Sequence, residues 1–120
     1  MVCDDDPVSR MLLAHGLAGR DFAVVEAGGA DEALARWREG GVSALITDMN
    51  MPGRSGADLI AALRAEERGR DTRTHVVVCS GDPAPLQGQG EAYDASISKP
   101  VDMRILFDTL AALGLEFKPA

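Results

Sequence analysis

The segment ALITDMNMPG, residues 44–53, decides the fold class of this chain. Its first four residues are small and mostly apolar without alternation, which is typical of a strand covered on both faces of a sheet. Asp48 follows directly. Pro52 and Gly53 then favour a loop, because the residue before a proline avoids the helical region and glycine allows a tight turn. The segment therefore predicts a buried strand that ends in an aspartate beside a loop.

Polar residues follow three other short apolar runs in the same way: Asp4 and Asp5 after residues 1–3, Ser80 after residues 76–79, and Lys99 with Pro100 after Ile97. Such residues converge only if the strands are parallel, because the carboxyl ends of parallel strands share one edge of the sheet. That edge is where α/β proteins place their ligands. We therefore expect these four sites to form one functional site.

The expected chemistry of this edge follows from its charges. Each pair among Asp4, Asp5 and Asp48 would repel by roughly 4 kcal/mol at about 4 Å and an effective dielectric constant near 20. Such a cluster either takes up protons or binds a cation, and Mg²⁺ prefers hard oxygen ligands. Lys99 supplies a compact positive charge and Ser80 a hydroxyl for a phosphoryl oxygen. We therefore expect a divalent cation and a phosphoryl group to be held on Asp48.

Strand and helix signals alternate along the chain, which predicts one α/β domain over residues 1–120. The expected strands are residues 1–3, 22–27, 44–47, 75–79 and 96–98. Four helices are expected: one that begins near Pro7, one over residues 30–39, one that begins near Ser55 and one over residues 102–113. The side chains expected to pack inward from the first and last helices are Met11, Leu12, Leu17, Ile105, Leu106, Leu110 and Leu113. Trp37 is expected in the core, and residues 64–73 are interpreted as solvated. Five glycines and prolines between Ser80 and Lys99 predict that a fourth helix there is short or irregular.

Composition excludes several classes of function. The net charge of −7 comes without a basic stripe, so direct binding of nucleic acid is not expected. No apolar run approaches the roughly 20 residues of a membrane helix, and no signal peptide is evident, so we expect a cytoplasmic protein with no membrane partner. Cys3 and Cys79 are expected to be small core residues rather than a disulfide or a metal pair.

The segments DDDPVSR, TDMNMPGRSG, VVVCSGD and SISKPVD together resemble the receiver domain of two-component response regulators, over nearly the whole chain. The resemblance implies a flavodoxin-like (CheY-like) parallel sheet of five strands in the order 2-1-3-4-5. It implies a phosphorelay signalling domain rather than an ordinary enzyme, one that catalyses its own phosphorylation and dephosphorylation. The implied donor is a phosphohistidine of a histidine kinase or of a histidine phosphotransfer protein, with Mg²⁺ or Mn²⁺ as cofactor.

The resemblance also assigns roles to individual residues. Asp48 is the implied phosphoacceptor, Lys99 contacts the phosphoryl group, and Ser80 is the switch hydroxyl. The implied metal ligands are Asp5 directly, Asp4 through water, Asp48 and the backbone carbonyl of Asn50. Asn50 and Asp82 are expected to tune the lifetime of the phosphoaspartate, and a cis peptide is plausible before Pro100.

Three features depart from the family pattern. Only three residues precede the acid pair, whereas a strand normally has about five or six. Ser96 stands where the family often has an aromatic residue, and Tyr93 would have the opposite side-chain parity. The interval from Ser80 to Lys99 is short and rich in glycine and proline where the family has a fourth helix. We therefore expect phosphorylation to change the surface formed by Ser80, residues 81–93 and the fifth strand.

Two other classes of function stay open at this point. One is a pseudo-receiver, in which the same fold serves only as a binding module. The other is a phosphatase of the haloacid-dehalogenase type, for which Asp4 and Asp6 match the Asp-x-Asp motif but no second acidic metal pair follows Lys99 on a strand. His15 and His75 are interpreted as surface or boundary residues rather than phosphodonors. The sequence does not indicate the cognate kinase, the output partner, the oligomeric state, the phosphoaspartate lifetime, or whether the domain stands alone or belongs to a larger regulator or hybrid kinase.

Overall fold

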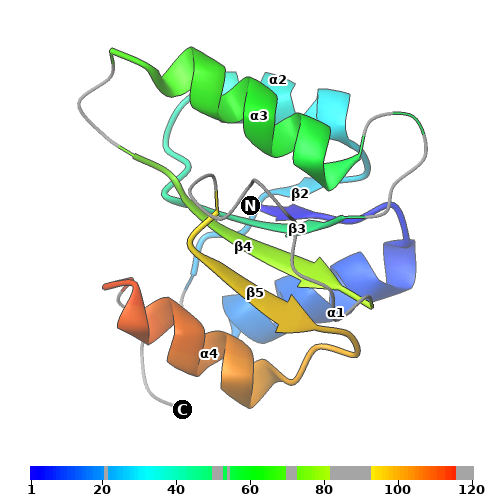
Figure 1. Ribbon diagram of the computed structural model, residues 1–120. Helices are drawn as coiled ribbons and strands as arrows, with labels where there is room; N and C mark the ends of the chain where they lie inside the picture. The colour runs from blue at the N-terminus through cyan, green and yellow to red at the C-terminus, as the bar shows by residue number, and fades with distance from the viewer. Residues whose placement is uncertain (21, 50–52, 54, 70–72, 82–92, 116–120) are drawn as a thin grey trace.

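The computed structural model describes residues 1–20, 22–49, 53, 55–69, 73–81 and 93–115, and shows a parallel sheet covered by helices on both faces (Figure 1). The five strands are β1 (Val2–Cys3), β2 (Glu26–Ala27), β3 (Ala44–Asp48), β4 (His75–Ser80) and β5 (Ala95–Ser98), in the order β2-β1-β3-β4-β5. The described helices are α1 (Pro7–Ala18), α2 (Ala30–Arg38), α3 (Gly56–Glu67) and α4 (Met103–Ala112). The predicted fold class and strand order are confirmed.

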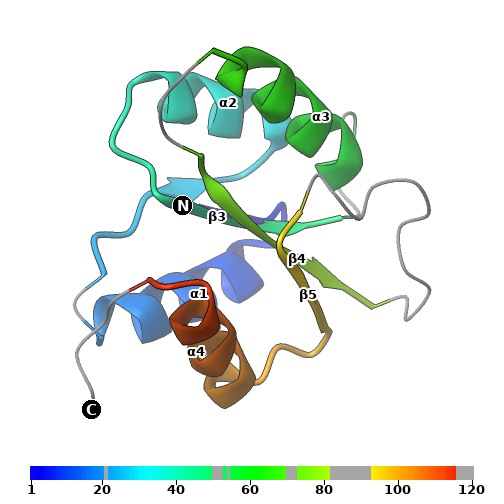
Figure 2. The ribbon, with the colours of Figure 1, turned by 60° about the vertical axis from the view of Figure 1, so that its left-hand side comes forward.

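Two apolar cores lie on the two faces of the sheet. Helices α2 and α3 cover one face, and α1 and α4 cover the other (Figures 1 and 2). Side chains of β4 alternate between the cores: Val76 and Val78 belong to the α2/α3 cluster, and Val77 and Cys79 to the α1/α4 cluster. This alternation is the period of two that a strand imposes on its side chains. It explains why residues 76–79 of the predicted strand are continuously apolar.

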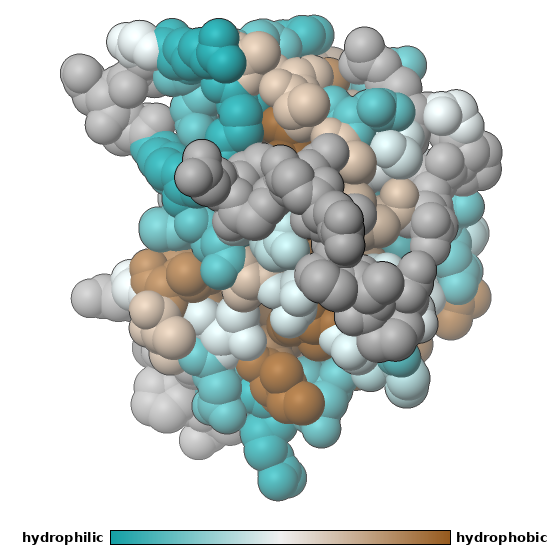
Figure 3. Space-filling view, viewed as in Figure 1, coloured by the Kyte–Doolittle hydropathy of each residue, from teal (hydrophilic) through white to brown (hydrophobic). Residues whose placement is uncertain are grey.

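The predicted inner faces of α1 and α4 were partly wrong. Met11 and Leu12 are 58 % and 62 % exposed, and Ile105 is 52 % exposed. In α1 the buried residues are Leu13, Ala14 and Leu17, which lie on the opposite side of the helix from Met11 and Leu12. Both helices carry apolar residues on more than one face, so sequence periodicity alone did not identify the face that meets the sheet. Figure 3 shows hydrophobic surface around α4 in the lower half of that view.

Strand boundaries also differ from those expected. Only Glu26 and Ala27 of the predicted strand 22–27 pair with β1, because β1 itself has two residues in the ladder. Strands β3 and β4 instead reach one residue further, to Asp48 and Ser80. The expected short or irregular helix after Ser80 falls on residues 82–92, which lie outside the described residues.

The stretch 64–73 was expected to be solvated, but its beginning takes part in a buried polar network. Arg64 Nη1 donates to Glu67 Oε1 at 2.6 Å and to the carbonyl of Thr74 at 2.8 Å. Glu67 Oε2 accepts from the backbone N–H of Thr74 at 2.7 Å. The Thr74 hydroxyl oxygen accepts from Trp37 Nε1 at 2.9 Å, and Trp37 is buried as expected. The network joins α2 and α3 to the amino end of β4.

Asp94 extends this network to β5. Its Oδ2 accepts from the backbone N–H of Val76 at 2.7 Å and lies 3.4 Å from Arg64 Nη2, and its Oδ1 pairs with Arg73. Burial raises the pKa of Asp94, but the bonds from Arg73 and Val76 and the two arginine charges outweigh burial and leave the pKa below its usual value. A partly buried carboxylate thus connects the amino ends of β4 and β5.

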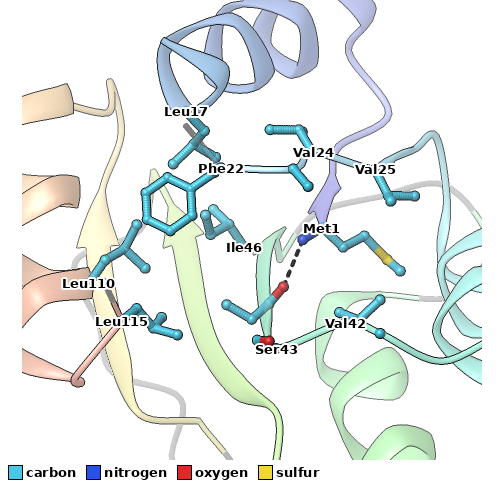
Figure 4. Close-up of a pocket in the computed structure, with 13 residues that line it drawn as sticks. Met1, Leu17, Phe22, Val24, Val25, Val42, Ser43, Ile46, Leu110 and Leu115 are labelled. Carbon is cyan, nitrogen blue, oxygen red and sulfur yellow. Dashed lines mark hydrogen bonds between the residues drawn. The ribbon is translucent and has the colours of Figure 1, made fainter. Parts of the chain in front are cut away.

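A mainly apolar groove of about 210 Å³ lies at this same amino edge of the sheet (Figure 4). Its walls come from α1, α4 and the extended segments before β2 and β3, and include Leu17, Phe22, Val42 and Leu110. The backbone nitrogen of Met1 donates to the carbonyl of Ala44 at 2.7 Å beside it. The groove is therefore on the opposite edge of the sheet from the predicted site.

Candidate functional site

Three carboxylates meet at the carboxyl edge of β1 and β3. Asp4 and Asp5 follow β1, and Asp48 is the last residue of β3; β1 and β3 are adjacent and parallel. One oxygen from each of the three carboxylates lies within 4.8 Å of the others. Asp4 and Asp48 are 2 % and 7 % exposed, whereas Asp5 is exposed. The structure therefore brings together the acids that the sequence placed on separate strands.

Lys99 lies beside two of these acids. Its Nζ is 3.1 Å from Asp48 Oδ2 and 3.4 Å from Asp4 Oδ2. Burial lowers the pKa of Lys99, but the hydrogen bond and charge of Asp48 and the charge of Asp4 outweigh burial, so the pKa is raised. The lysine is therefore a permanent cation at neutral pH. The Lys99–Pro100 peptide bond is cis, as the sequence suggested.

Hydrogen bonds hold both the carboxylate and the backbone of Asp4. Oδ1 accepts from the backbone N–H of Asp6 at 2.9 Å, and Oδ2 faces Lys99. The Asp4 backbone N–H donates to the carbonyl of Ala27 at 3.1 Å, and its own carbonyl accepts from Arg10 Nη1 at 2.9 Å. For Asp5 there is no hydrogen bond or ion pair within the described ranges. The exposed Asp5 is thus the acid with the most freedom to meet an ion.

Gly56 supports the loop after Asp48, and sequence reasoning missed it. A Cβ added at Gly56 would lie 2.3 Å from the carbonyl oxygen of Asp48 and 2.9 Å from the Cα of Met49. The Gly56 N–H donates to the carbonyl of Met49 at 3.0 Å. Ser55 and Asp58 form a capping box at the start of α3. A glycine at the first residue of a capped helix, where alanine is the better helix former, was the available signal.

Ser80 ends β4 next to the same edge. It is opposite Ser98 in the β4–β5 register, and its carbonyl accepts from the Lys99 backbone N–H at 2.9 Å. Ser96 is exposed, and Tyr93 packs against the α2/α3 core. Asn50 and Asp82, which the sequence placed in this site, lie outside the described residues.

The donors present suit a hard cation. Carboxylate oxygens are the ligands that Mg²⁺ and Mn²⁺ prefer, whereas thiolates select softer metals. Burial raises the pKa of Cys79 to about 12 and that of Cys3 to about 11, so both thiols stay neutral in the core. The residues therefore fit a magnesium-type ion held by oxygen atoms.

A second groove, of about 360 Å³, opens directly beside these charges. It lies between α1 and the segment that joins β5 to α4. Leu12, Leu13, Val101 and Met103 provide its apolar surface, and Asp4, Ser9 and Lys99 its polar side. The exposed side chains of Val8 and Met11 continue the apolar surface of Leu12 along α1. An apolar surface therefore borders the acidic site.

Known proteins with related sequences or folds agree on one family. A family model described as the response regulator receiver domain matches residues 1–111. The sensory/regulatory protein RpfC of Xanthomonas campestris pv. campestris is 34 % identical over 118 residues, which are 96 % of this chain and 16 % of that protein. The chain thus spans less than a fifth of this curated relative.

Solved structures give the same result. A response regulator receiver protein from Pseudomonas putida is 31 % identical with a TM-score of 0.78, covering 92 % of this chain and 93 % of that one. A sensor protein from Polaromonas sp. JS666 is 30 % identical with a TM-score of 0.81, covering 92 % and 90 %. None of the helices in the described part of the chain is both long and apolar enough to cross a membrane.

Proposed function

The chain belongs to the response regulator receiver family, and we propose that residues 1–120 form the phosphoacceptor domain of a two-component phosphorelay. Receiver domains are signalling domains, and Asp48 is the residue we assign as phosphoacceptor. The observation that carries this assignment is the contact of Lys99 Nζ with Asp48 Oδ2 at 3.1 Å, inside a cluster of three carboxylates. An ammonium group held between Asp4 and Asp48 is suited to pair with an oxygen of a phosphoryl group on Asp48.

The proposed step is a transfer between two side chains. A carboxylate oxygen of Asp48 attacks the phosphorus of a phosphohistidine, and the P–N bond breaks as the P–O bond forms. The electron pair of the P–N bond returns to the imidazole, which takes up a proton. Asp4, Asp5, Asp48 and the carbonyl of Asn50 would hold Mg²⁺ or Mn²⁺, which neutralises charge on the phosphoryl oxygens when bound.

Readout and lifetime involve neighbouring residues. Ser80 lies at the end of β4, where its hydroxyl can hydrogen-bond a phosphoryl oxygen, and we propose that the segment 81–93 and β5 respond to phosphorylation. Ser96 has no aromatic ring to turn inward, so the response differs from a hydroxyl–aromatic switch. Asn50 and Asp82 are proposed to influence the attacking water that removes the phosphoryl group.

The proposed partner is a histidine kinase or a histidine phosphotransfer protein. The groove beside Asp4 and Lys99, with the exposed Val8, Met11 and Leu12 of α1, offers such a partner an apolar surface next to the acceptor. The domain is proposed to act in the cytoplasm, without direct contact to nucleic acid or membrane. The net charge of −7 disfavours both phosphate backbones and anionic lipids.

The phosphatase alternative is weakened by the place of Asp6. Its carboxylate caps α1 by accepting from Val8 N and Ser9 Oγ, and it is not in the acid cluster. Asp102, one of the acids after Lys99, similarly caps α4 by accepting from the N–H of Arg104 at 2.8 Å. Asp6 and Asp102 are therefore both engaged as helix caps.

Phosphorylation by acetyl phosphate tests the proposal. The wild-type chain is incubated with acetyl phosphate and Mg²⁺, and the gain of one phosphoryl group is measured by intact-protein mass spectrometry. We expect labelling of the wild type and of Asp108→Asn, an exposed acid on α4, but not of Asp48→Asn. Absence of labelling in the wild type would favour the pseudo-receiver, and equal labelling of Asp48→Asn would overturn the assignment.

A further inference from the structure

Arg10 links the ends of β1 and β2, and within the described part of the chain it makes no hydrogen bond or ion pair with the three carboxylates of the cluster. It lies in the first turn of α1, where its Nη1 donates to the backbone carbonyl of Asp4 at 2.9 Å. Its Nε lies 3.4 Å from Glu26 Oε1 on β2. The Arg10 side chain is 24 % exposed and that of Glu26 is 48 % exposed, so the arginine is half-buried and its carboxylate partner faces solvent. A planar guanidinium can serve both partners at once, because its donors form a rigid fork.

Gly28 leaves room for this guanidinium. A Cβ added at Gly28 would lie 3.1 Å from Arg10 Nη1, closer than an ordinary van der Waals contact. The φ angle of Gly28 is not in the left-handed region, so its backbone does not itself require glycine. The absence of a side chain at Gly28 therefore matters because of the arginine.

The carbonyl that Arg10 holds belongs to the peptide unit between Asp4 and Asp5. A peptide unit is planar, so fixing its oxygen also fixes the N–H and Cα of Asp5. The other side of Asp4 is fixed by the hydrogen bond from its N–H to Ala27. Because Asp5 has no side-chain partner within the described ranges, this peptide unit sets the point from which its carboxylate extends.

We propose that Arg10 is a positioning residue that sets the place of the Asp5 carboxylate through the Asp4 carbonyl, with Glu26 and Gly28 aiming the guanidinium. The inference rests on the proposed function, in which Asp5 is a metal ligand. Repulsion from Asp4 and Asp48 drives the exposed Asp5 outward in the metal-free protein. Arg10 resists that movement, so Mg²⁺ finds its ligands already close together.

Charge alone predicts the opposite effect, which makes the proposal testable. Removing a cation near three carboxylates would tighten Mg²⁺ binding if Arg10 acted only through its charge. If Arg10 positions Asp5, its loss weakens Mg²⁺ binding. Mutation of groups that orient metal ligands typically lowers metal affinity by about 10- to 100-fold. Arg10→Lys keeps the charge but loses the fork, and therefore separates the two effects.

The experiment measures Mg²⁺ binding by isothermal titration calorimetry and the ¹H–¹⁵N shift of the Asp5 amide in metal-free protein. For Arg10→Lys, Arg10→Gln and Gly28→Ala, we expect binding to weaken by about tenfold and the Asp5 amide signal to move. Arg38→Gln is the control, because Arg38 on α2 makes an ion pair with Glu66 that involves neither Arg10 nor Gly28. Circular dichroism establishes that each variant is folded, and Gly28→Ala tests the positioning with Arg10 still in place.

Unchanged or tighter Mg²⁺ binding in both Arg10→Lys and Gly28→Ala would overturn the positioning role. A wild-type chain that binds no Mg²⁺ and is not labelled at Asp48 would instead refute the proposed function and the inference with it. A wild type that is labelled while the variants bind Mg²⁺ normally refutes the inference alone.

Discussion

Replacing Asp5 by asparagine should stabilise the metal-free protein and remove most of its response to Mg²⁺. One oxygen each of Asp5, Asp4 and Asp48 lies within 4.8 Å of the others. At that separation a pair of charges repels by about 3.5 kcal/mol at an effective dielectric constant of 20 and by about 0.9 kcal/mol in bulk water. Asp5 is exposed, so the lower figure applies to each of its two pairs, and the charge of Lys99 offsets part of the sum.

The expected gain in the free energy of unfolding without metal is therefore about 1 kcal/mol, or roughly 4 °C in Tm. With Mg²⁺ at 100 times its dissociation constant, the wild type should gain about 2.7 kcal/mol, and Asp5→Asn much less. The order of stability should thus reverse: Asp5→Asn is the more stable protein in EDTA and the less stable one in Mg²⁺.

Urea unfolding in EDTA and in saturating Mg²⁺ measures both effects. Asp108→Asn removes an exposed acid outside the cluster, so its stability relative to the wild type should be the same in EDTA and in Mg²⁺. If Asp5→Asn is destabilised in EDTA, Asp5 is not repelled by the other two acids in the metal-free protein. If both proteins gain equal stability from Mg²⁺, Asp5 does not help to bind the ion.

Two further changes probe the supports of the site. Gly56→Ala places a Cβ 2.3 Å from the Asp48 carbonyl oxygen, so we expect a loss of about 1–3 kcal/mol in unfolding free energy and slower labelling by acetyl phosphate; normal values for both would contradict the contact. Asp94 has a lowered pKa, so its stabilisation is complete above its unfolded pKa and disappears as pH falls through its folded pKa. Thermal unfolding from about pH 6 to pH 3 should therefore show a shallower loss for Asp94→Asn than for the wild type, and parallel curves would rule out this role.

The placement of the acids could be predicted from sequence because it depends on local signals. A buried run followed by Asp48, and another followed by Asp4 and Asp5, requires only parallel strands to bring the carboxylates to one edge. The alternating pattern supplied the parallel strands. The same rule predicted that Lys99 would lie near these acids, and its Nζ is 3.1 Å from Asp48 Oδ2.

The contacts that support the site depend on tertiary packing, so the sequence indicates them only weakly. Met11 and Leu12 lie on an apolar face of α1 that periodicity could not distinguish from the buried one. The partners of Arg64 include Asp94, which is 30 residues away, so a charged stretch could not be recognised as a buried network. The need for glycine at position 56 is evident only from the structure, where the Asp48 carbonyl oxygen leaves no room for a Cβ.

The hydrogen bond from Trp37 to Thr74 has a practical spectroscopic consequence. Trp37 is the single tryptophan of the chain, is 4 % exposed, and is attached to the residue that precedes β4. The acids lie at the other end of the strands. Its fluorescence should therefore follow unfolding while remaining insensitive to occupancy of the acidic site, so emission gives a stability signal that ligand-induced quenching does not distort. Binding must then be followed by heat or by nuclear resonance, and the two kinds of measurement stay independent.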